Sequence, residues 1–406
     1  MEKNEPLTIV KVLYARPHIG GSGIMGTELA LELARRGHDV HIVSYPGTYL
    51  SKEEEKLLKI HPIPDITYGS FKTPPTALTF PGTIRMLAND LSIDVLHAHY
   101  GVTHGEAVID ARDILRRDMK RGKLTGQKRN PVAIISNVGT DVSVNGYRPV
   151  MVPGLELRLS QADGITFVSK SLQDEARAVF DLDDYGVVIP NFINEENFQR
   201  PEDDHINKEL RERLGIGLDE LVFYHVSNFR PVKNVGTIVD AYNNAVERGM
   251  KGTRLLFVGD GPEKHVAETK AKKYGLKEQV IFTGMVPHER VADYHQVGNV
   301  LVLPSLKESF GLVSLEAMHL GNAVIASNRG GIPEVVESGV SGYLADPKDI
   351  AAFAHYMLVL AQNPEKMREM GEEGKRIARQ RFDRAKVCSM YEDLYYSLLK
   401  KQNRAE

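Results

Sequence analysis

The chain has 406 residues, enough for two or three domains at about 150 residues per domain. Its 51 basic and 54 acidic side chains leave a formal charge of −3, which argues against a nucleic-acid partner. A single cysteine excludes an internal disulfide and a cysteine-based metal cluster, and no export signal or apolar run of about 18 residues is recognisable. We therefore expect a globular, cytoplasmic protein.

The first half of the chain, from Leu7 to Asn191, alternates short β-branched runs with helix-like stretches. This alternation predicts a parallel sheet with helices on both faces. One helix is expected over Thr27–Arg36, because Gly37 suits the position that follows a helix. The expected strands of this half are Thr8–Tyr14, His38–Ser44, Asp94–His99, Val132–Ser136, Gly164–Ser169 and Val187–Pro190.

A polar segment that contains a proline, Glu195–Asp204, is the best candidate for a linker. After it the alternation restarts, which predicts a second doubly wound domain with helices over Val235–Arg248 and Lys264–Tyr274. Its strands are expected at Leu221–Val226, Arg254–Val258, Gln279–Phe282, Asn299–Leu303 and Ala323–Ala326. The expected domains are an N-terminal one over residues 1–195, a C-terminal one over residues 196–380, and a last helix, 381–406, docking back on the first.

The run Gly21–Gly26 has the spacing Gly-x-Gly-x-x-Gly between an expected strand and an expected helix. Such glycines let the backbone approach an anion at a helix N-terminus. A nicotinamide dinucleotide is disfavoured, because the loop from Ala15 to Gly20 is longer than a Rossmann turn and the second strand ends at Ser44 and Tyr45 without an acidic residue. A glycine-lined loop for another ligand is the preferred hypothesis, and a purely structural turn stays open.

Two cations, Arg230 and Lys233, follow the first strand of the second domain and precede its next helix. At the carboxyl end of a strand, such a pair is suited to neutralise a diphosphate, since Arg offers a planar fork and Lys a point charge. The alternative is a pair of solvated surface cations.

Two carboxylates, Glu308 and Glu316, lie on either side of residues 309–315. The first is expected in a loop after a strand, and the second in the following helix. If that helix begins near Phe310 or Gly311, the free amides of its first turn and both acids can reach one ligand. The Ser-Phe-Gly sequence between the acids strengthens the hypothesis of a ligand site.

Together these residues resemble glycosyltransferase family 4, and the likeness covers nearly the whole chain. It rests on Glu308 with Glu316, Arg230 with Lys233, and two glycine turns, Gly259–Glu263 and Gly330–Glu334. The resemblance implies the α/β fold called GT-B, with two doubly wound, Rossmann-like domains that face a cleft. It also implies retaining transfer of N-acetylglucosamine from a UDP-sugar to a small soluble acceptor such as L-malate, with no cofactor or metal ion required.

The resemblance further implies roles for individual residues. Arg230 and Lys233 would bind the departing diphosphate, Glu308 the transferred sugar, and these three are the expected catalytic residues. The other expected donor-binding residues are Glu316, which would hold the ribose, and Gly21, Gly23, Gly259, Met285, Val286, Ser309, Phe310, Gly311, Leu312 and Val313. The expected acceptor-binding residues are Ser22, Tyr100, Ser136, Asn137 and Arg158. Same-face attack, with the leaving phosphate taking the proton, requires no enzyme nucleophile, so neither Glu308 nor Asp141 is assigned that role.

Two positions depart from the family pattern. Many members have histidine immediately before the Gly-Thr-Asp segment, where this chain has Val138. Either Asn137 makes the polar contact in place of that histidine, or the donor sugar and the acceptor differ from those that the resemblance implies. A dianionic acceptor such as L-malate also needs a cation, yet the position where an arginine is expected is Glu156, and Arg158 points to another side of the helix.

Other functions stay open at this point. One is a family 4 transferase with another donor, or with a sugar, sugar-phosphate or lipid-linked acceptor. From other classes, a GT-B sugar-nucleotide epimerase and a nucleotide-sugar-binding protein without turnover remain alternatives. The sequence also leaves open whether the chain forms a homo-oligomer.

Three further patterns have plain interpretations. His97 and His99 are predicted to be ordinary strand-end histidines rather than metal ligands, because no third ligand is recognisable. The Asp181-Leu182-Asp183 segment is predicted to be a loop, and no metal is assigned to it. The basic stretch Arg116–Arg129 is predicted to be a solvated helix end and loop, with peripheral membrane contact as the alternative.

Overall fold

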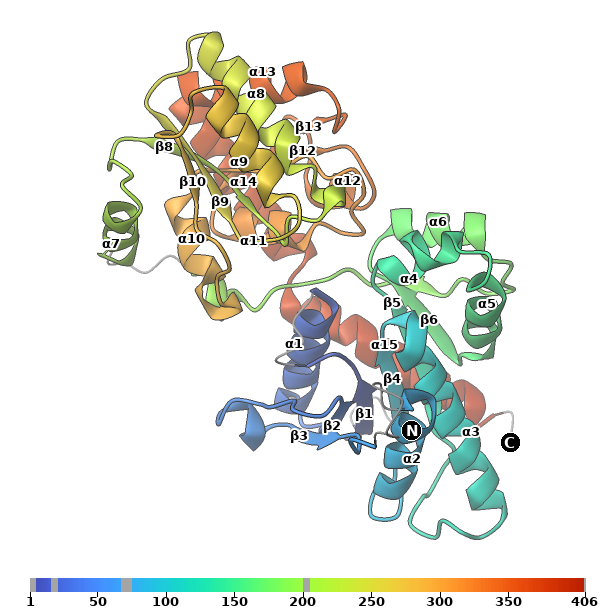
Figure 1. Ribbon diagram of the computed structural model, residues 1–406. Helices are drawn as coiled ribbons and strands as arrows, with labels where there is room; N and C mark the ends of the chain where they lie inside the picture. Colours follow the sequence, from blue (N-terminus) through green and yellow to red (C-terminus); the bar gives the residue numbers. More distant parts are fainter. Residues whose placement is uncertain (1–4, 16–20, 67–74, 200–204, 405–406) are drawn as a thin grey trace. The chain divides into compact units, whose positions relative to one another are not determined.

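The computed structural model describes residues 5–15, 21–66, 75–199 and 205–404. These residues form two compact units (Figure 1). Unit 1 takes the described residues up to Asn191 and those from Arg384 onward, and unit 2 takes those from Phe192 to Asp383. The chain therefore returns to unit 1 for its last helix.

Unit 1 contains a parallel sheet, with seven described strands in the order β3-β2-β1-β4-β5-β6-β7. The strands are β1 (Thr8–Val12), β2 (Asp39–Ser44), β3 (Lys59–Pro62), β4 (Val95–His99), β5 (Val132–Asn137), β6 (Gly164–Phe167) and β7 (Val187–Val188). The order reverses between β1 and β4. Because crossovers between parallel strands are right-handed, this reversal distributes the helices over both faces of the sheet.

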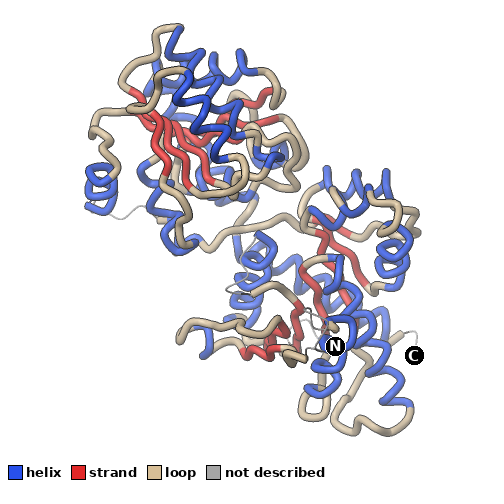
Figure 2. The backbone as a smooth tube through the Cα atoms, viewed as in Figure 1, coloured by secondary structure: helices blue, strands red, loops and turns tan. Residues whose placement is uncertain are grey.

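The helices of unit 1 are α1 (Gly21–Arg35), α2 (Thr76–Leu87), α3 (Glu106–Lys120), α4 (Thr140–Ser143), α5 (Val152–Gln161), α6 (Lys170–Val179) and α15 (Arg384–Gln402). Helix α1 packs beside the C-terminal helix α15, while α2 packs beside α3. Tyr391, Tyr395 and Leu399 form the buried side of α15. Figure 2 shows the strands of each unit lying between helices.

The first helix corrects one expectation. Helix α1 begins at Gly21 rather than at Thr27, so the Gly21–Gly26 motif lies inside its first turns instead of in a turn before it. The small size of Gly26 matters here, because a Cβ at this position would lie 3.1 Å from Leu13 and 3.2 Å from His99. The segment Arg16–Gly20, which belongs to the predicted long loop, lies outside the described residues.

Unit 2 contains a second parallel sheet, with six described strands in the order β10-β9-β8-β11-β12-β13. They are β8 (Leu221–Val226), β9 (Thr253–Val258), β10 (Val280–Phe282), β11 (Val300–Leu303), β12 (Ala323–Ser327) and β13 (Gly342–Ala345). The order reverses between β8 and β11. The carboxyl ends of these two strands therefore form the topological switch point, where open α/β sheets bind their ligands.

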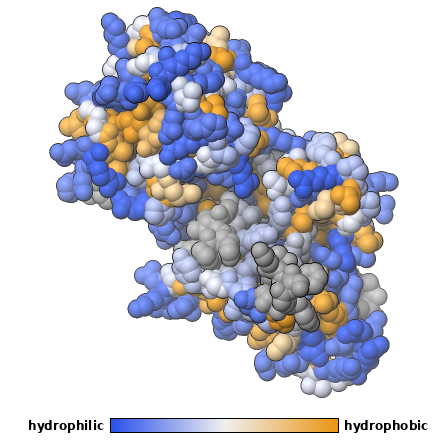
Figure 3. Space-filling model, in the orientation of Figure 1, coloured by the Kyte–Doolittle hydropathy of each residue, from blue (hydrophilic) through white to orange (hydrophobic). Residues whose placement is uncertain are grey.

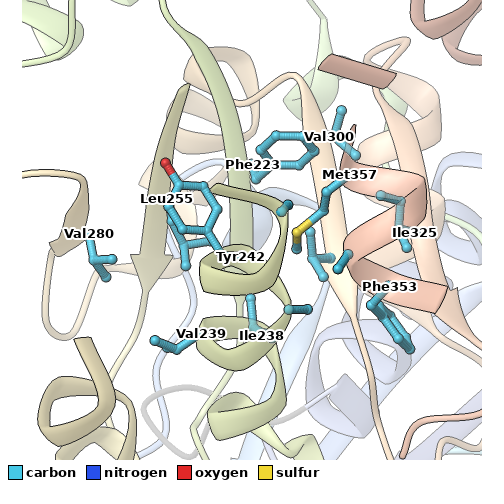
Figure 4. Close-up of a cluster of buried hydrophobic side chains, with 14 of the residues drawn as sticks. Phe223, Ile238, Val239, Tyr242, Leu255, Val280, Val300, Ile325, Phe353 and Met357 are labelled. Carbon is cyan, nitrogen blue, oxygen red and sulfur yellow. The ribbon is translucent and has the colours of Figure 1, made fainter. Parts of the chain in front are cut away.

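The helices of unit 2 are α7 (His205–Arg213), α8 (Val235–Glu247), α9 (Lys264–Lys273), α10 (Val291–Val297), α11 (Leu312–His319), α12 (Ile332–Val335), α13 (Ile350–Gln362) and α14 (Pro364–Arg381). Helix α8 packs between α9 and α13, and α11 packs against α10 and α14. Figure 4 shows the core under α8 and α13, where Tyr242, Phe353 and Met357 meet Phe223 and Ile325 of the sheet. Because successive strand residues point to opposite faces, Tyr224 lies on the face of the sheet opposite this core.

The alternation of strands and helices predicted from the sequence is confirmed, with two strands added. Strands β3 and β13 lack β-branched runs, and they form because β2 and β12 offer hydrogen-bonding partners. The first part of the predicted linker forms a 3-10 helix, Glu195–Phe198, within unit 2. Its last part, residues 200–204, lies outside the described residues.

The visible surface in Figure 3 is mostly hydrophilic, with small separate areas of hydrophobic side chains. No helix in the described parts of the chain is long and apolar enough to span a membrane. Within the basic stretch Arg116–Arg129, three arginines pair with carboxylates: Arg116 with Asp163, Arg117 with Asp118 and Arg129 with Asp94.

Candidate active site

The predicted cation and carboxylate of unit 2 meet at the switch point of its sheet. Lys233 ends the short 3-10 helix Pro231–Lys233 after β8, and Glu308 lies in the loop after β11. Because β8 and β11 are neighbours, the Lys233 Nζ atom reaches Glu308 Oε2 at 2.6 Å. Both side chains keep about a fifth of their surface exposed, 21% and 18%. Arg230, three residues before Lys233, is exposed, so two positive charges border this edge.

The segment that carries the cations is held by hydrogen bonds to its neighbours. The Leu306 backbone N–H donates to the Val232 carbonyl at 2.8 Å, which ties the loop after β8 to the loop after β11. Asn234 has a left-handed backbone, with φ of 54°, and its side-chain amide donates to the carbonyls of Pro304 and Pro347. The position of Lys233 is therefore set by contacts on both sides.

A buried histidine lies beneath this segment. Burial lowers the pKa of His225 to about 4, so its imidazole is neutral at ordinary pH. Its Nδ1–H donates to the Val302 carbonyl at 2.8 Å, and its Nε2 accepts from the Ser227 hydroxyl at 2.7 Å. The Ser227 oxygen in turn accepts from the Phe229 backbone N–H at 3.1 Å. This chain connects β11 to the turn that presents the cations.

The Gly330–Glu334 turn holds the backbone of Glu308 in place. The Gly331 backbone N–H donates to the Glu308 carbonyl at 3.0 Å. Gly330 has a left-handed backbone, with φ of +59°, and a Cβ there would lie only 1.8 Å from the same carbonyl oxygen. No side chain fits at Gly330 unless Glu308 moves, which gives this turn a direct structural role in the site.

Helix α11 begins beside Glu308. Gly311 precedes it with φ of 91°, and helix geometry leaves the backbone N–H groups of Leu312 and Val313 without an acceptor inside the helix. Phe310 is buried against Phe382, with ring centroids 5.5 Å apart, so its side chain anchors the turn. The expected helix start near Phe310 or Gly311 is therefore confirmed, and its free amides lie next to Ser309.

Glu316 lies one turn further along α11 and is almost fully buried. Its Oε2 atom accepts a hydrogen bond from His295 Nε2 at 3.2 Å. No group among the described residues pairs with its Oε1 atom. One of the two carboxylate oxygens is thus held by the protein.

The ends of β9 and β10 complete this edge of unit 2. Gly259 pairs with Gly284 in an antiparallel bridge, its N–H donating to the Gly284 carbonyl at 3.0 Å. A Cβ on Gly259 would lie 2.0 Å from the Ser227 carbonyl, so glycine permits the close approach to the loop after β8. Met285 is 78% exposed beside half-buried Val286.

In unit 1, Tyr100 follows β4 at the carboxyl edge of the sheet. Its hydroxyl lies 2.9 Å from Thr140 Oγ1 and accepts from the Asn145 amide at 3.3 Å. Burial raises the pKa of Tyr100, which therefore stays protonated. Its ring lies near those of Tyr14 and His104. This edge is lined by aromatic rings and hydroxyl groups.

Asp141 organises the neighbouring turn. Its two carboxylate oxygens accept four backbone N–H groups, those of Gly101, Val138, Gly139 and Val142, at 2.8 to 3.2 Å. The side chain is fully buried, and burial raises its pKa although the four hydrogen bonds oppose the change. Its lone pairs are thus used by the backbone, which suits a structural role and not that of a nucleophile.

The other predicted acceptor residues lie in different surroundings. Asn137 is buried beside Gly101, and its Nδ2 atom has no partner among the described residues. Ser136 is buried in the interior, where its hydroxyl contacts His97 and Thr166. The Arg158 guanidinium pairs with Asp110 at 2.9 Å and with Glu106 at 3.3 Å. Gly21, Ser22 and Gly23 form the first turn of α1, where Ser22 is half-buried.

The predicted strand-end histidines take part in a buried cluster. Lys11 Nζ lies 3.2 Å from His97 Nδ1 and 2.8 Å from His99 Nε2, and Tyr395 of α15 bonds to the same His97 nitrogen. Across the described residues, no group of three or more His, Cys, Asp or Glu side chains is arranged to hold a metal ion. The Asp181 backbone N–H donates to Glu156 at 3.0 Å.

Comparison with known proteins identifies the family. The model of glycosyltransferase family 4 matches residues 19–197, and the model of glycosyl transferases group 1 matches residues 206–377. N-acetyl-alpha-D-glucosaminyl L-malate synthase of Bacillus anthracis is 31% identical over 385 residues, 95% of this chain and 96% of the relative. The chain belongs to glycosyltransferase family 4. D-inositol 3-phosphate glycosyltransferase of Xylanimonas cellulosilytica is 26% identical, over 94% of this chain and 93% of its own length.

Solved structures show that this family 4 protein has the GT-B fold. HepE of Anabaena in complex with UDP and glucose superposes with a TM-score of 0.76 at 18% identity, over 96% of this chain and 100% of that one. A glycosyltransferase of Rickettsia africae superposes with a TM-score of 0.77 at 17% identity, over 98% and 99% of the two chains. The two doubly wound units are therefore the two Rossmann-like halves of a GT-B glycosyltransferase.

The family 4 motifs in the sequence led to one edge of unit 2 but not to all of its parts. Lys233, Glu308 and Glu316 lie within motifs that can be recognised locally. His295, Tyr224 and Asn322 were missed because they come from three separate segments. For Tyr224 a signal was available, because it is followed by His225 in the otherwise apolar strand β8, and a search for buried polar residues would have found this pair.

Proposed function

We propose that the protein is a retaining glycosyltransferase that moves N-acetylglucosamine from UDP-N-acetylglucosamine to a small soluble acceptor such as L-malate. The observation that carries this proposal is the Lys233–Glu308 pair at the switch point of unit 2, with the exposed Arg230 three residues before Lys233. The similarity to a synthase of N-acetyl-alpha-D-glucosaminyl L-malate supports the choice of sugar and acceptor. The structural similarity to a protein crystallised with UDP-glucose supports the choice of a UDP-sugar.

The chemistry follows from the charge that develops on the leaving group. As the bond between the anomeric carbon and the diphosphate breaks, negative charge grows on the phosphate oxygens. Arg230, Lys233 and the free N–H groups of Leu312 and Val313 stabilise that charge more in the transition state than in the ground state. Because these donors are fixed by the fold, they need no reorganisation during the reaction.

Glu308 has two tasks in this proposal. Its Oε2 atom keeps Lys233 in place, and its Oε1 atom accepts a hydrogen bond from a hydroxyl group of the transferred sugar. The acceptor hydroxyl attacks the anomeric carbon from the face that the diphosphate leaves, and its proton passes to a leaving phosphate oxygen. This sequence retains the anomeric configuration without a carboxylate nucleophile, in agreement with the backbone role of Asp141.

We assign acceptor binding to unit 1, at Tyr100, Asn137 and Ser22. The unpartnered amide of Asn137 and the Tyr100 hydroxyl offer hydrogen bonds to a hydroxylated acceptor. Arg158 would have to exchange its contacts with Glu106 and Asp110 to bind a dianion. A neutral sugar or a sugar phosphate is therefore the second candidate for the acceptor.

The proposal is tested by incubating the purified protein with UDP-, GDP- and ADP-sugars, with and without L-malate, and analysing the mixtures by mass spectrometry. We expect UDP release and a new glycoside only when UDP-N-acetylglucosamine and L-malate are both present, and NMR of the product should show an α linkage. Release of UDP with a neutral sugar or a sugar phosphate instead of L-malate would identify the second candidate as the acceptor. An isomerised donor, or binding without turnover, would contradict transfer and support an epimerase or a binding protein.

A further inference from the structure

Behind Glu316, four buried side chains form a continuous chain of hydrogen bonds. His295 Nε2 lies 3.2 Å from Glu316 Oε2, and His295 Nδ1 lies 2.8 Å from the Tyr224 hydroxyl. The Asn322 amide donates to the same hydroxyl at 2.9 Å and to the His295 carbonyl at 2.6 Å. Tyr224 and His295 are fully buried, and Asn322 is 1% exposed. The chain joins β8, α10, α11 and the loop before β12, and Figure 1 labels these two helices and both strands.

The chemistry of the groups decides which nitrogen carries the proton. A carboxylate accepts hydrogen bonds and cannot donate, so His295 Nε2 must carry a hydrogen to bond to Glu316 Oε2. In the neutral imidazole, Nδ1 then has a lone pair and accepts from the Tyr224 hydroxyl. Asn322 donates into the oxygen of that hydroxyl. Each partner thus favours the tautomer that points a donor at Glu316.

The surrounding packing keeps the Tyr224 ring in this position. Tyr224 points to the face of the sheet opposite Phe223, because successive strand residues alternate. The ring passes so close to Gly298 that a Cβ there would lie 2.2 Å from it. It also meets the His295 ring edge to face, with centroids 5.3 Å apart. The absence of a side chain at Gly298 thus leaves space for the ring.

We propose that His295 is a positioning residue for donor binding: it holds the Glu316 carboxylate so that Oε1 meets the ribose hydroxyls of the nucleoside diphosphate. Tyr224 and Asn322 set the tautomer of His295. The inference rests on the proposed function, because it assumes that Glu316 binds the ribose. Its physical basis is that a buried carboxylate needs a partner, and that a side chain already held in place loses less entropy when the ligand binds.

The test compares the affinity for UDP with that for 2′,3′-dideoxy-UDP by calorimetry. We expect Glu316→Gln to abolish the preference for the ribose hydroxyls and His295→Leu to lower it about tenfold, as for loss of a hydrogen bond to a charged group. His295→Gln, which keeps an N–H donor, should restore most of the preference. In turnover assays, His295→Leu should raise the KM for the UDP-sugar about tenfold and change kcat less than about twofold, because the breaking bond lies elsewhere.

Two tyrosines supply a matched pair of variants. Tyr224→Phe removes the hydroxyl next to His295 and should lower the ribose preference about threefold, since the tautomer is no longer imposed. Tyr242 is equally buried on the other face of the same sheet, and its hydroxyl bonds to Thr253. Tyr242→Phe should therefore leave the ribose preference unchanged. A purely structural role for Tyr224 predicts the same result for both variants.

The outcomes separate this inference from the proposed function. If Glu316→Gln keeps the preference for the ribose hydroxyls, the role of Glu316 in the proposed function is wrong. If Glu316→Gln loses the preference while His295→Leu and Tyr224→Phe keep it, the positioning role is overturned. Should circular dichroism show that His295→Leu does not fold, Tyr224→Phe decides, and an unchanged preference in that variant overturns the inference.

Discussion

The carboxyl edges of the two sheets use charge in different ways. In unit 2, Lys233 and Glu308 pair with each other while both keep part of their surface exposed. In unit 1, the carboxylate at the corresponding edge, Asp141, is buried, and four backbone N–H groups occupy its oxygens. The charges of unit 2 thus remain accessible to a ligand, while the charge of unit 1 stabilises a turn.

This difference teaches that an acidic residue at a strand end need not take part in the reaction. What distinguishes the two carboxylates is the partner: a lysine side chain for Glu308 and backbone amides for Asp141. The Tyr100 hydroxyl and the Asn137 amide, which we propose to bind the acceptor, are instead uncharged. We therefore expect variants of unit 2 to affect the departing diphosphate and variants of unit 1 to affect the acceptor.

The largest effect is expected from Lys233→Ala. Loss of one fixed donor to the departing diphosphate should lower kcat about 100- to 1000-fold. Arg254→Ala is the matched control, because Arg254 pairs with Glu220 at the opposite edge of the same sheet, with similar exposure of 23% and 24%. Steady-state kinetics of both variants check the prediction. Equal kcat values for the two would contradict the assignment of Lys233.

A smaller effect is expected from Gly330→Ala, which tests whether the position of Glu308 matters. The new Cβ would displace the Glu308 carbonyl, and a shift of about 1 Å in a site can lower the rate about 10- to 100-fold. Gly339→Ala is the control, because Gly339 also has a positive φ, +84°, but has no atom within 4 Å of the new Cβ. Both variants share the backbone strain, so a similar loss of kcat in both would argue against a specific role for Gly330.

The Asn137→Ala variant tests the assignment of acceptor binding to unit 1. Removing an amide that offers a hydrogen bond to the acceptor should raise the acceptor KM about fivefold to tenfold. The Kd for UDP should stay within about twofold of the wild-type value, because UDP is assigned to unit 2. Calorimetry with UDP and kinetics with varied acceptor measure the two quantities. A weaker affinity for UDP with an unchanged acceptor KM would reverse the assignment.

A separate effect, on stability and not on activity, concerns the interior of unit 1, where burial lowers the pKa of Lys11 far below its usual value. Lys11 faces His97, His99 and Cys388, whose thiol pKa burial raises to about 12. The unfolded chain binds a proton that the folded chain excludes. Stability should therefore rise with pH below about 10, by up to about 1.4 kcal/mol per pH unit.

Lys11→Met removes this titration, so the difference in stability between wild type and variant should move in favour of the wild type as the pH is raised from about 7 to about 10. Melting temperatures measured across this range check the expected trend. The exposed Lys56→Met serves as a control in the same unit, and its melting curve should shift in parallel with that of the wild type. If the melting temperature of Lys11→Met also changed with pH in parallel with that of the wild type, a neutral Lys11 in the folded protein would be contradicted.

Several elements of the fold and site could be predicted because their signals are local. Strand β8 was expected at Leu221–Val226 and lies there, since a run of apolar and β-branched residues bounded by polar turns defines it. The start of α11 followed from Gly311. The start of α1 was placed six residues too late, because glycine has a low helix propensity and the packing of α1 against β2 and β4 outweighs it.

By itself, the sequence determined the two doubly wound halves and the positions of Arg230, Lys233, Glu308 and Glu316 at strand ends and in the following helix, because periodicity and turn residues act over a few neighbouring positions. Only the tertiary structure decided which groups meet: Lys233 with Glu308, Gly330 with the Glu308 carbonyl, and His295 with Glu316. These contacts depend on which strands become neighbours at the switch point and on which face each residue points to. That order is set by packing between segments far apart in the chain, and no short stretch of sequence contains it.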